Sequence, residues 1–106
     1  IYALLVRYLI KKVPVLGMAH ITGGGIVENL PRIIPDGLSA KVDYGSWERP
    51  EIFNKIMKSG DIEEEEMRRV FNLGIGFCVV VDKDHVNDAM SLIGNDCWTI
   101  GEVVRL

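Results

Sequence analysis

The sequence predicts an α/β (or α+β) fold, a layered domain in which helices pack on a mixed sheet of about four or more strands. Three observations carry this prediction. Runs with the two-residue period of a strand alternate with runs that have the period of a helix. Hydrophobic residues make up 48% of the 106 residues and charged residues 25%, a composition typical of a folded protein. The loops between runs are short, so we expect residues 1–106 to form a single domain.

A helix and a strand are expected first. Residues 1–12 place apolar side chains on one helical face and two lysines at the end, where cations suit the helix dipole. Pro14 and Gly17 break this helix, and the apolar run 18–22 is a candidate strand. The chain begins without Met and inside this helical pattern. We therefore expect it to be a piece of a longer protein.

The next elements are short. Residues 26–30 predict one or two helical turns, which Pro31 interrupts because proline lacks a backbone N–H. A second turn follows at 31–34. Residues 39–44 alternate polar and apolar side chains, the pattern of a half-buried strand.

Two helices should fill the middle of the chain. Pro50 fits the first turn of a helix that Gly60 ends. Asp61 and Glu64 have the spacing of a capping box for the next helix. The apolar positions expected to be buried on these two helices are Ile52, Phe53, Ile56, Met57, Met67, Val70 and Phe71.

The last part of the chain predicts strand, helix, strand. Residues 77–81 are uninterrupted apolar and favour a central strand that is covered on both faces. Asp84 should cap a helix that Gly94 ends, which leaves the neighbouring His85 exposed. The final strand should carry Trp98, Ile100 and Val104 on one face.

Charge and cysteine content exclude several classes of partner. The formal net charge is −3 and the pI is about 5.3, so we expect neither nucleic acid nor an anionic membrane to bind. No apolar run approaches the roughly 20 residues of a membrane span. Cys78 and Cys97 do not form a Cys-x-x-Cys motif. We expect free thiols and a cytoplasmic location.

The glycine triplet 23–25 is the first segment that suggests chemistry. It follows a strand and opens a helix, so its backbone N–H groups, with no Cβ in the way, can hold a phosphate or carboxylate. It is not a P-loop, and Glu28 stands where the dinucleotide fingerprint has glycine or alanine. An anion-binding turn and a purely structural turn both stay open, and the pattern alone favours the second.

Other polar residues give weaker signals. His20 is either a proton donor beside the glycine turn or a strand histidine satisfied by the backbone, and the pattern favours the latter. Asn72, before Gly74 and Gly76, either hydrogen-bonds an amide or hydroxyl of a ligand or belongs to a helix C-cap, and both alternatives stay open. The glutamates at 63–66 predict a solvated helix start. We expect no metal ligands and find no nucleophile.

Four segments, in this order along the chain, resemble the C-terminal half of one enzyme family. They are Ala-His-Ile-Thr-Gly-Gly-Gly at 19–25, Glu-Asn-Leu-Pro-Arg at 28–32, Phe-Asn-Leu-Gly-Ile-Gly at 71–76 and Ile-Gly-Glu-Val at 100–103. The family is that of phosphoribosylformylglycinamidine cyclo-ligase, also called aminoimidazole ribonucleotide synthetase. Each motif is weak by itself, but together they span the chain.

The resemblance implies an ATP-dependent ligase of purine biosynthesis. In this family ATP phosphorylates the formyl amide oxygen of formylglycinamidine ribonucleotide, the amidine nitrogen attacks, and phosphate leaves as the imidazole ring closes. ATP and Mg²⁺ are bound mainly by the N-terminal half, through which two subunits pair as a homodimer. The resemblance thus implies that residues 1–106 are the C-terminal domain, with the N-terminal domain as partner. We expect this domain alone to be inactive and to hold no cofactor.

The resemblance also changes the weight of the candidate residues. Contact with substrate or its phosphate becomes the expectation for the triplet and is extended to other polar positions, with His20 as the candidate catalytic group. The candidate binding residues are Thr22, Gly23, Gly24, Gly25, Asn29 and Asn72. Two alternatives stay open. The first is a related family with the same two-half architecture: formylglycinamidine ribonucleotide synthase, selenophosphate synthetase, thiamine monophosphate kinase or a hydrogenase maturation factor. The second is a non-catalytic small-molecule binding module.

Overall fold

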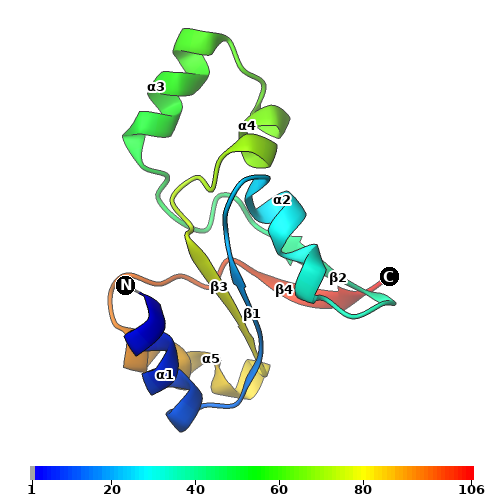
Figure 1. The fold of residues 1–106 in the computed structure, drawn as a ribbon, viewed down its shortest axis with the longest axis vertical. Helices are drawn as coiled ribbons and strands as arrows, with labels where there is room; N and C mark the ends of the chain where they lie inside the picture. The colour runs from blue at the N-terminus through cyan, green and yellow to red at the C-terminus, as the bar shows by residue number, and fades with distance from the viewer. Residues whose placement is uncertain (1) are drawn as a thin grey trace.

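The computed structural model describes the backbone of residues 2–106 and the side chains of residues 3–106. Ile1, which the sequence assigns to the first helix, lies outside the described residues. Within them the chain forms five α-helices, two 3₁₀ turns and four strands (Figure 1), which confirms the α/β class. None of the described helices is long and apolar enough to span a bilayer.

The four strands pair two by two. β1 (Val15–His20) pairs antiparallel with β3 (Phe77–Val81), and β2 (Leu38–Val42) pairs antiparallel with β4 (Gly101–Arg105). The prediction of one mixed sheet is therefore wrong, because the four strands form two separate two-stranded antiparallel sheets. β3 has one strand neighbour among the described residues and is not a central strand.

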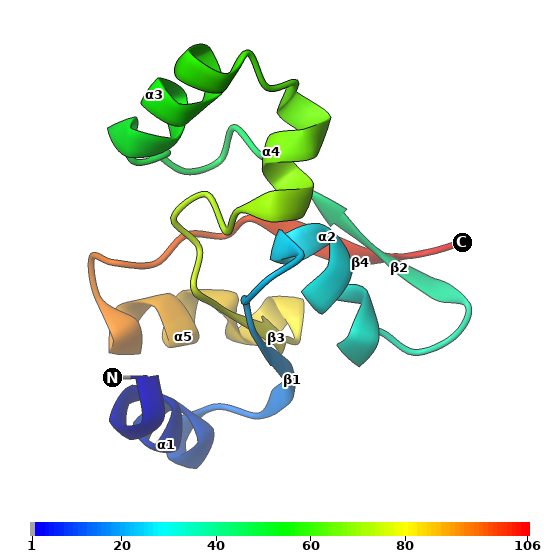
Figure 2. The ribbon, with the colours of Figure 1, turned by 45° about the horizontal axis from the view of Figure 1, so that its top comes forward.

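Two helices cover one end of the β1–β3 sheet. α1 (Tyr2–Lys12) and α5 (Val86–Ile93) lie side by side there (Figures 1 and 2). Leu9, Val13 and Ala89 form a small buried cluster between them. Side chains of both β1 and β3 pack against this cluster, so the two helices are held by apolar contact with the sheet.

The larger core lies on the other side of the β1–β3 sheet. It is closed by α2 (Gly25–Asn29), the 3₁₀ turn Pro31–Ile33, α3 (Glu51–Gly60) and α4 (Glu64–Val70). α3 and α4 form a helical hairpin at the end of the molecule opposite α1 (Figure 1). The buried members of this core are Ala19, Ile21, Ile26, Leu30, Trp47, Met67, Leu73, Ile75 and Cys78.

Several predicted helix boundaries are corrected. Asp61 does not begin a capping box: it is the C-cap of α3, with a left-handed φ of 51°, and Glu63 is the N-cap of α4. Glu64 instead directs its carboxylate to two arginines. Val70 is 48% exposed, because α4 ends there and turns this side chain outward. Ile52 is 57% exposed at the start of α3.

The C-terminal elements also differ from expectation. Asp84 lies inside a 3₁₀ turn, and His85 is the residue that precedes α5. His85 is half-buried rather than exposed, and its Nδ1 has no hydrogen-bond partner among the described residues. Trp98 lies before β4 and is 43% exposed. Gly94 ends α5 with a φ of 96°, as predicted.

Candidate functional site

The glycine triplet forms a tight turn between β1 and α2. The N–H of Gly25 donates to the carbonyl of Thr22 at 3.0 Å, which closes the turn. Gly24 and Gly25 have φ angles of 95° and 62°, in the left-handed region that favours glycine. Thr22 and Gly23 are exposed, whereas Gly25 is buried. The turn therefore has one face in the core and one face on the surface.

The three glycines are needed for different reasons. A Cβ at Gly25 would overlap the backbone carbonyl oxygens of Arg68 and Phe71, at the end of α4. A Cβ at Gly24 would collide with the side chain of Glu28, whose carboxylate lies against the turn. At Gly23 a Cβ would meet nothing within 4 Å, and φ is not in the left-handed region. Gly23 thus has no internal requirement to be glycine.

Asn29 holds the turn from inside. Its side-chain nitrogen Nδ2 donates to the carbonyl of Gly25 at 2.8 Å. It also lies 3.2 Å from the carbonyl of Gly23 and 3.3 Å from that of Thr22. The Thr22 hydroxyl donates to Oδ1 of Asn29 at 3.3 Å. With Asn29 only 5% exposed, its carboxamide is committed to the turn itself.

The segment 72–76, part of the third family motif (71–76), lies beside the turn. The N–H of Ile21 donates to the carbonyl of Gly76 at 2.9 Å, which joins the end of β1 to the entry of β3. Asn72 accepts the N–H of Gly74 through Oδ1 at 2.8 Å, which forms an Asx turn. It is not the helix C-cap considered as the alternative, because the C-cap of α4 is Phe71. Both segments reach the same end of the β1–β3 sheet (Figure 1).

The backbone of the 72–76 segment is fixed by Trp47 and Pro50. Leu73 is 1% exposed and has a left-handed φ of 57°, an uncommon conformation for a residue with a Cβ. The indole Nε1 of Trp47 donates to the carbonyl of Leu73 at 3.0 Å. Gly74 packs against the ring of Pro50, where a Cβ would come within 2.6 Å of Cδ. Packing, rather than local preference, therefore maintains this conformation.

His20 ends β1 at the same end of the sheet. It is exposed and lies opposite Phe77 in the strand register, with ring centroids 6.2 Å apart. His20, Thr22 and Gly23 are thus all exposed and follow one another at the end of β1.

An ion-pair network that the sequence reading missed supports this region. Arg49 donates two hydrogen bonds to Glu64, at 2.8 and 2.7 Å, and Arg68 donates a third through Nε at 2.8 Å. These arginines lower the pKa of Glu64 to about 2. Only the spacing of Glu64 and Arg68, four residues apart on a helix, could have signalled the network.

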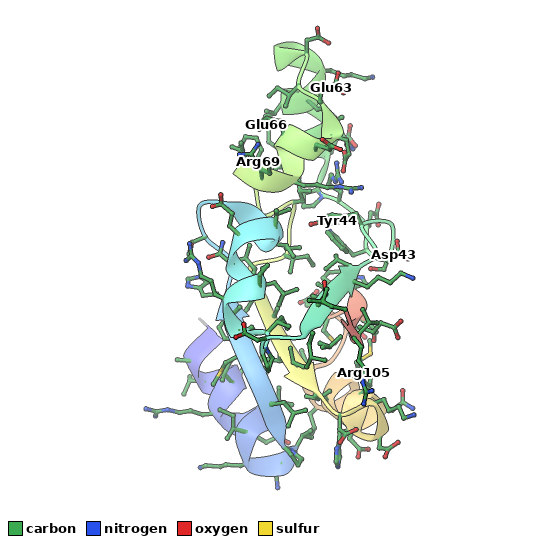
Figure 3. All side chains as sticks on the ribbon, turned by 90° about the vertical axis from the view of Figure 1, so that its right-hand side faces the viewer. Asp43, Tyr44, Glu63, Glu66, Arg69 and Arg105 are labelled. Atoms are coloured by element: carbon green, nitrogen blue, oxygen red, sulfur yellow. The ribbon has the colours of Figure 1, made fainter. Side chains whose placement is uncertain are left out.

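Tyr44 connects the network to the strand region. The guanidinium of Arg68 lies 3.9 Å from the centre of the Tyr44 ring, a cation–π contact. Figure 3 shows Tyr44 and Asp43 at the end of β2, below the helical end that carries Glu66 and Arg69. Because the Arg68 carbonyl also touches the turn at Gly25, the network stabilises the helix on which the turn rests.

The turn forms an open surface. Two shallow grooves, of about 270 and 250 Å³, lie between the α2 region and β2, and neither includes the triplet. Within the described residues, no three His, Cys, Asp or Glu side chains lie close enough to hold a metal ion. The outer face of the turn, at Thr22 and Gly23, is therefore exposed and lies in neither groove.

Comparison with known proteins places this chain in a family. A protein of Prochlorococcus marinus (strain MIT 9211) named phosphoribosylformylglycinamidine cyclo-ligase is 52% identical over 107 residues. The match covers 97% of this chain and 31% of the relative. Proteins of the same name from Caldanaerobacter subterraneus subsp. tengcongensis and Pseudothermotoga lettingae are 48% and 50% identical, over 92% and 83% of this chain and 30% and 27% of the relatives. The chain thus spans less than a third of the length of these relatives.

The family model described as "AIR synthase related protein, C-terminal domain" matches residues 1–105. The match includes the glycine turn, the 72–76 segment and all four strands. This chain therefore belongs to the AIR synthase related family, as its C-terminal domain.

Proposed function

We propose that the protein carrying this chain is an ATP-dependent cyclo-ligase that converts formylglycinamidine ribonucleotide to aminoimidazole ribonucleotide in purine biosynthesis. The observation that carries the proposal is the identity of about half the residues, over nearly the whole chain, with proteins named for this activity. Activation of the formyl amide oxygen by phosphorylation makes it a leaving group, and attack by the amidine nitrogen then closes the ring with release of phosphate.

Residues 1–106 are proposed to supply one wall of the substrate site. The exposed backbone at Gly23 and the half-buried backbone at Gly24 offer N–H groups to a phosphate, and the Thr22 hydroxyl lies beside them. Gly25, Asn29 and Asn72 enter the proposal through the backbone they shape. His20, exposed two residues before Thr22, remains the candidate for proton transfer.

ATP and Mg²⁺ are assigned to the rest of the protein. Mg²⁺ prefers carboxylate and phosphate oxygens, and the described residues bring no suitable group of carboxylates together. When bound, ATP supplies the phosphoryl group that activates the amide. We further propose a cytoplasmic homodimer whose N-terminal domain faces the turn. The free thiols of Cys78 and Cys97 agree with a reducing compartment.

The test of the activity uses the full-length protein. Incubation with formylglycinamidine ribonucleotide and ATP should form aminoimidazole ribonucleotide with one ADP and one phosphate per product, and the 106-residue chain alone should form none. A full-length protein that hydrolyses ATP without forming the aminoimidazole product would point to one of the related families instead.

The test of the site uses Gly23→Ala, because the added methyl group meets nothing in this chain. If substrate approaches the turn, kcat/KM should fall at least about tenfold, the equivalent of 1.4 kcal/mol, with the melting temperature unchanged. Ser59→Ala, at an exposed position of α3, is the matched control. Full activity of Gly23→Ala would remove the turn from the substrate site.

A further inference from the structure

We propose that Asn29 is a positioning residue of this site. Its buried carboxamide gathers the carbonyl groups of the turn on the inner side and so directs the N–H groups of Gly23 and Gly24 outward, toward the phosphate of the ribonucleotide. This inference rests on the proposed function and adds a role that the exposed residues alone do not reveal, because Asn29 itself is 5% exposed.

The Asn29 side chain makes all its hydrogen bonds to the turn residues Thr22, Gly23 and Gly25. Its Nδ2 carries two hydrogens and serves three carbonyls, the closest being that of Gly25 at 2.8 Å. Its Oδ1 accepts the Thr22 hydroxyl at 3.3 Å. Asn29 is the C-terminal residue of α2, so the helix that begins at the turn folds back to fix the turn's carbonyls.

The direction of these carbonyls determines the direction of the Gly23 and Gly24 N–H groups. The described chain contains no cis peptide, and in a planar trans peptide the C=O and N–H point in opposite directions. The Thr22 carbonyl shares a peptide with the Gly23 N–H, and the Gly23 carbonyl shares one with the Gly24 N–H. Both carbonyls point to Asn29, so both N–H groups point away from it. Neither N–H has an acceptor among residues 2–106.

An aspartate at position 29 would test the role with almost no change of size. A carboxylate only accepts hydrogen bonds, so it would face the carbonyl oxygens of Thr22, Gly23 and Gly25 without a hydrogen to share. The carbonyls would then turn away, and the N–H groups would leave the outer surface. Asn54→Asp, on the exposed face of α3, introduces the same charge as a matched control.

The experiment measures steady-state kinetics of full-length Asn29→Asp. The KM for formylglycinamidine ribonucleotide should rise at least about tenfold, while kcat and the KM for ATP change less than about threefold; Asn54→Asp should behave as the parent protein. A fall in kcat that follows a loss of folded protein, with the KM for the ribonucleotide unchanged, would show a merely structural role and overturn the inference.

A measurement on the unmodified protein covers the case in which Asn29→Asp does not fold. Hydrogen–deuterium exchange of the peptide that contains Gly23 and Gly24 should slow severalfold when the ribonucleotide or inorganic phosphate is added. No protection by either would overturn the inference, even in a protein that makes the aminoimidazole product. Protection by phosphate in a protein that makes no such product would sustain it and refute only the proposed reaction.

Discussion

Replacing Gly25 with alanine should destabilise the domain far more than the same change at Gly23. An alanine at position 25 would have to keep the backbone φ of 62°, and this left-handed conformation costs a residue with a side chain about 1–2 kcal/mol. It would also overlap the carbonyl oxygens of Arg68 and Phe71, and overpacking costs about 1–3 kcal/mol. The expected loss is therefore about 2–5 kcal/mol. Because both obstacles are backbone atoms, of Arg68 in α4 and of its C-cap Phe71, a side-chain rearrangement cannot relieve them.

At Gly23 neither term applies. The new methyl group meets nothing within 4 Å and the backbone is not left-handed, so the free energy of unfolding should change by no more than about 0.5 kcal/mol. Urea denaturation of the 106-residue chain, followed by tryptophan fluorescence, gives both values. A loss below about 1 kcal/mol for Gly25→Ala, or an equal loss at the two positions, would refute this account of the turn.

Gly24 is less informative as a test position. A valine there meets both a φ of 95° and the side chain of Glu28, so stability and activity would fall together whether or not a ligand approaches. Substitutions at Gly23 and Gly25 distinguish loss of ligand contact from loss of stability, whereas a substitution at Gly24 would cause both.

Three further outcomes are expected. Glu64→Gln should lower stability at neutral pH by about 1 kcal/mol, since it removes the charge that two arginines bind. Because folding lowers the pKa of Glu64 from 4.5 to about 2, its contribution is complete above pH 4.5 and is lost as the pH falls toward 2. Melting curves across that range should show a smaller decline for Glu64→Gln, and equal declines would contradict the ion pair. Met67→Ala, at a fully buried side chain, should cost about 2–5 kcal/mol in urea denaturation. Trp47→Phe should cost about 1–3 kcal/mol, because the carbonyl of Leu73 loses its donor; an unchanged midpoint would show that this bond adds nothing.

The sequence was sufficient where a short segment determines its own structure. The helix over 86–93 and its end at Gly94 follow from apolar spacing and from a glycine that adopts a positive φ. Pro31 likewise divides two helical turns as expected, because its missing N–H acts on its immediate neighbours. These features need no information from the rest of the chain.

Strand pairing could not be predicted in the same way. The apolar run 77–81 predicts a strand covered on both faces, but it does not indicate which elements cover it. In the structure β3 has β1 on one edge, and α1 and α5 supply much of its apolar contact. The hydrophobic run thus predicted a strand correctly, but only Cys78 of its five residues is buried, and its neighbours are not those of a central strand.

The candidate site shows the same division. The turn at 23–25 was visible because three consecutive glycines have few other uses. That a Cβ at Gly25 would overlap the end of α4, whereas a Cβ at Gly23 would meet nothing, depends on residues more than 40 positions away. The partners of Asn29 and the arginines around Glu64 are likewise tertiary contacts, which no local pattern encodes.

The apolar interior is divided between two clusters that share only the β1–β3 ribbon. The smaller one, with Leu9, Val13 and Ala89, can open without disturbing the nine buried residues beneath the glycine turn. Two cooperative units of unequal stability follow from such a division. Damage to α1 or α5 would then loosen one end of the molecule while the end that carries the glycine turn keeps its shape.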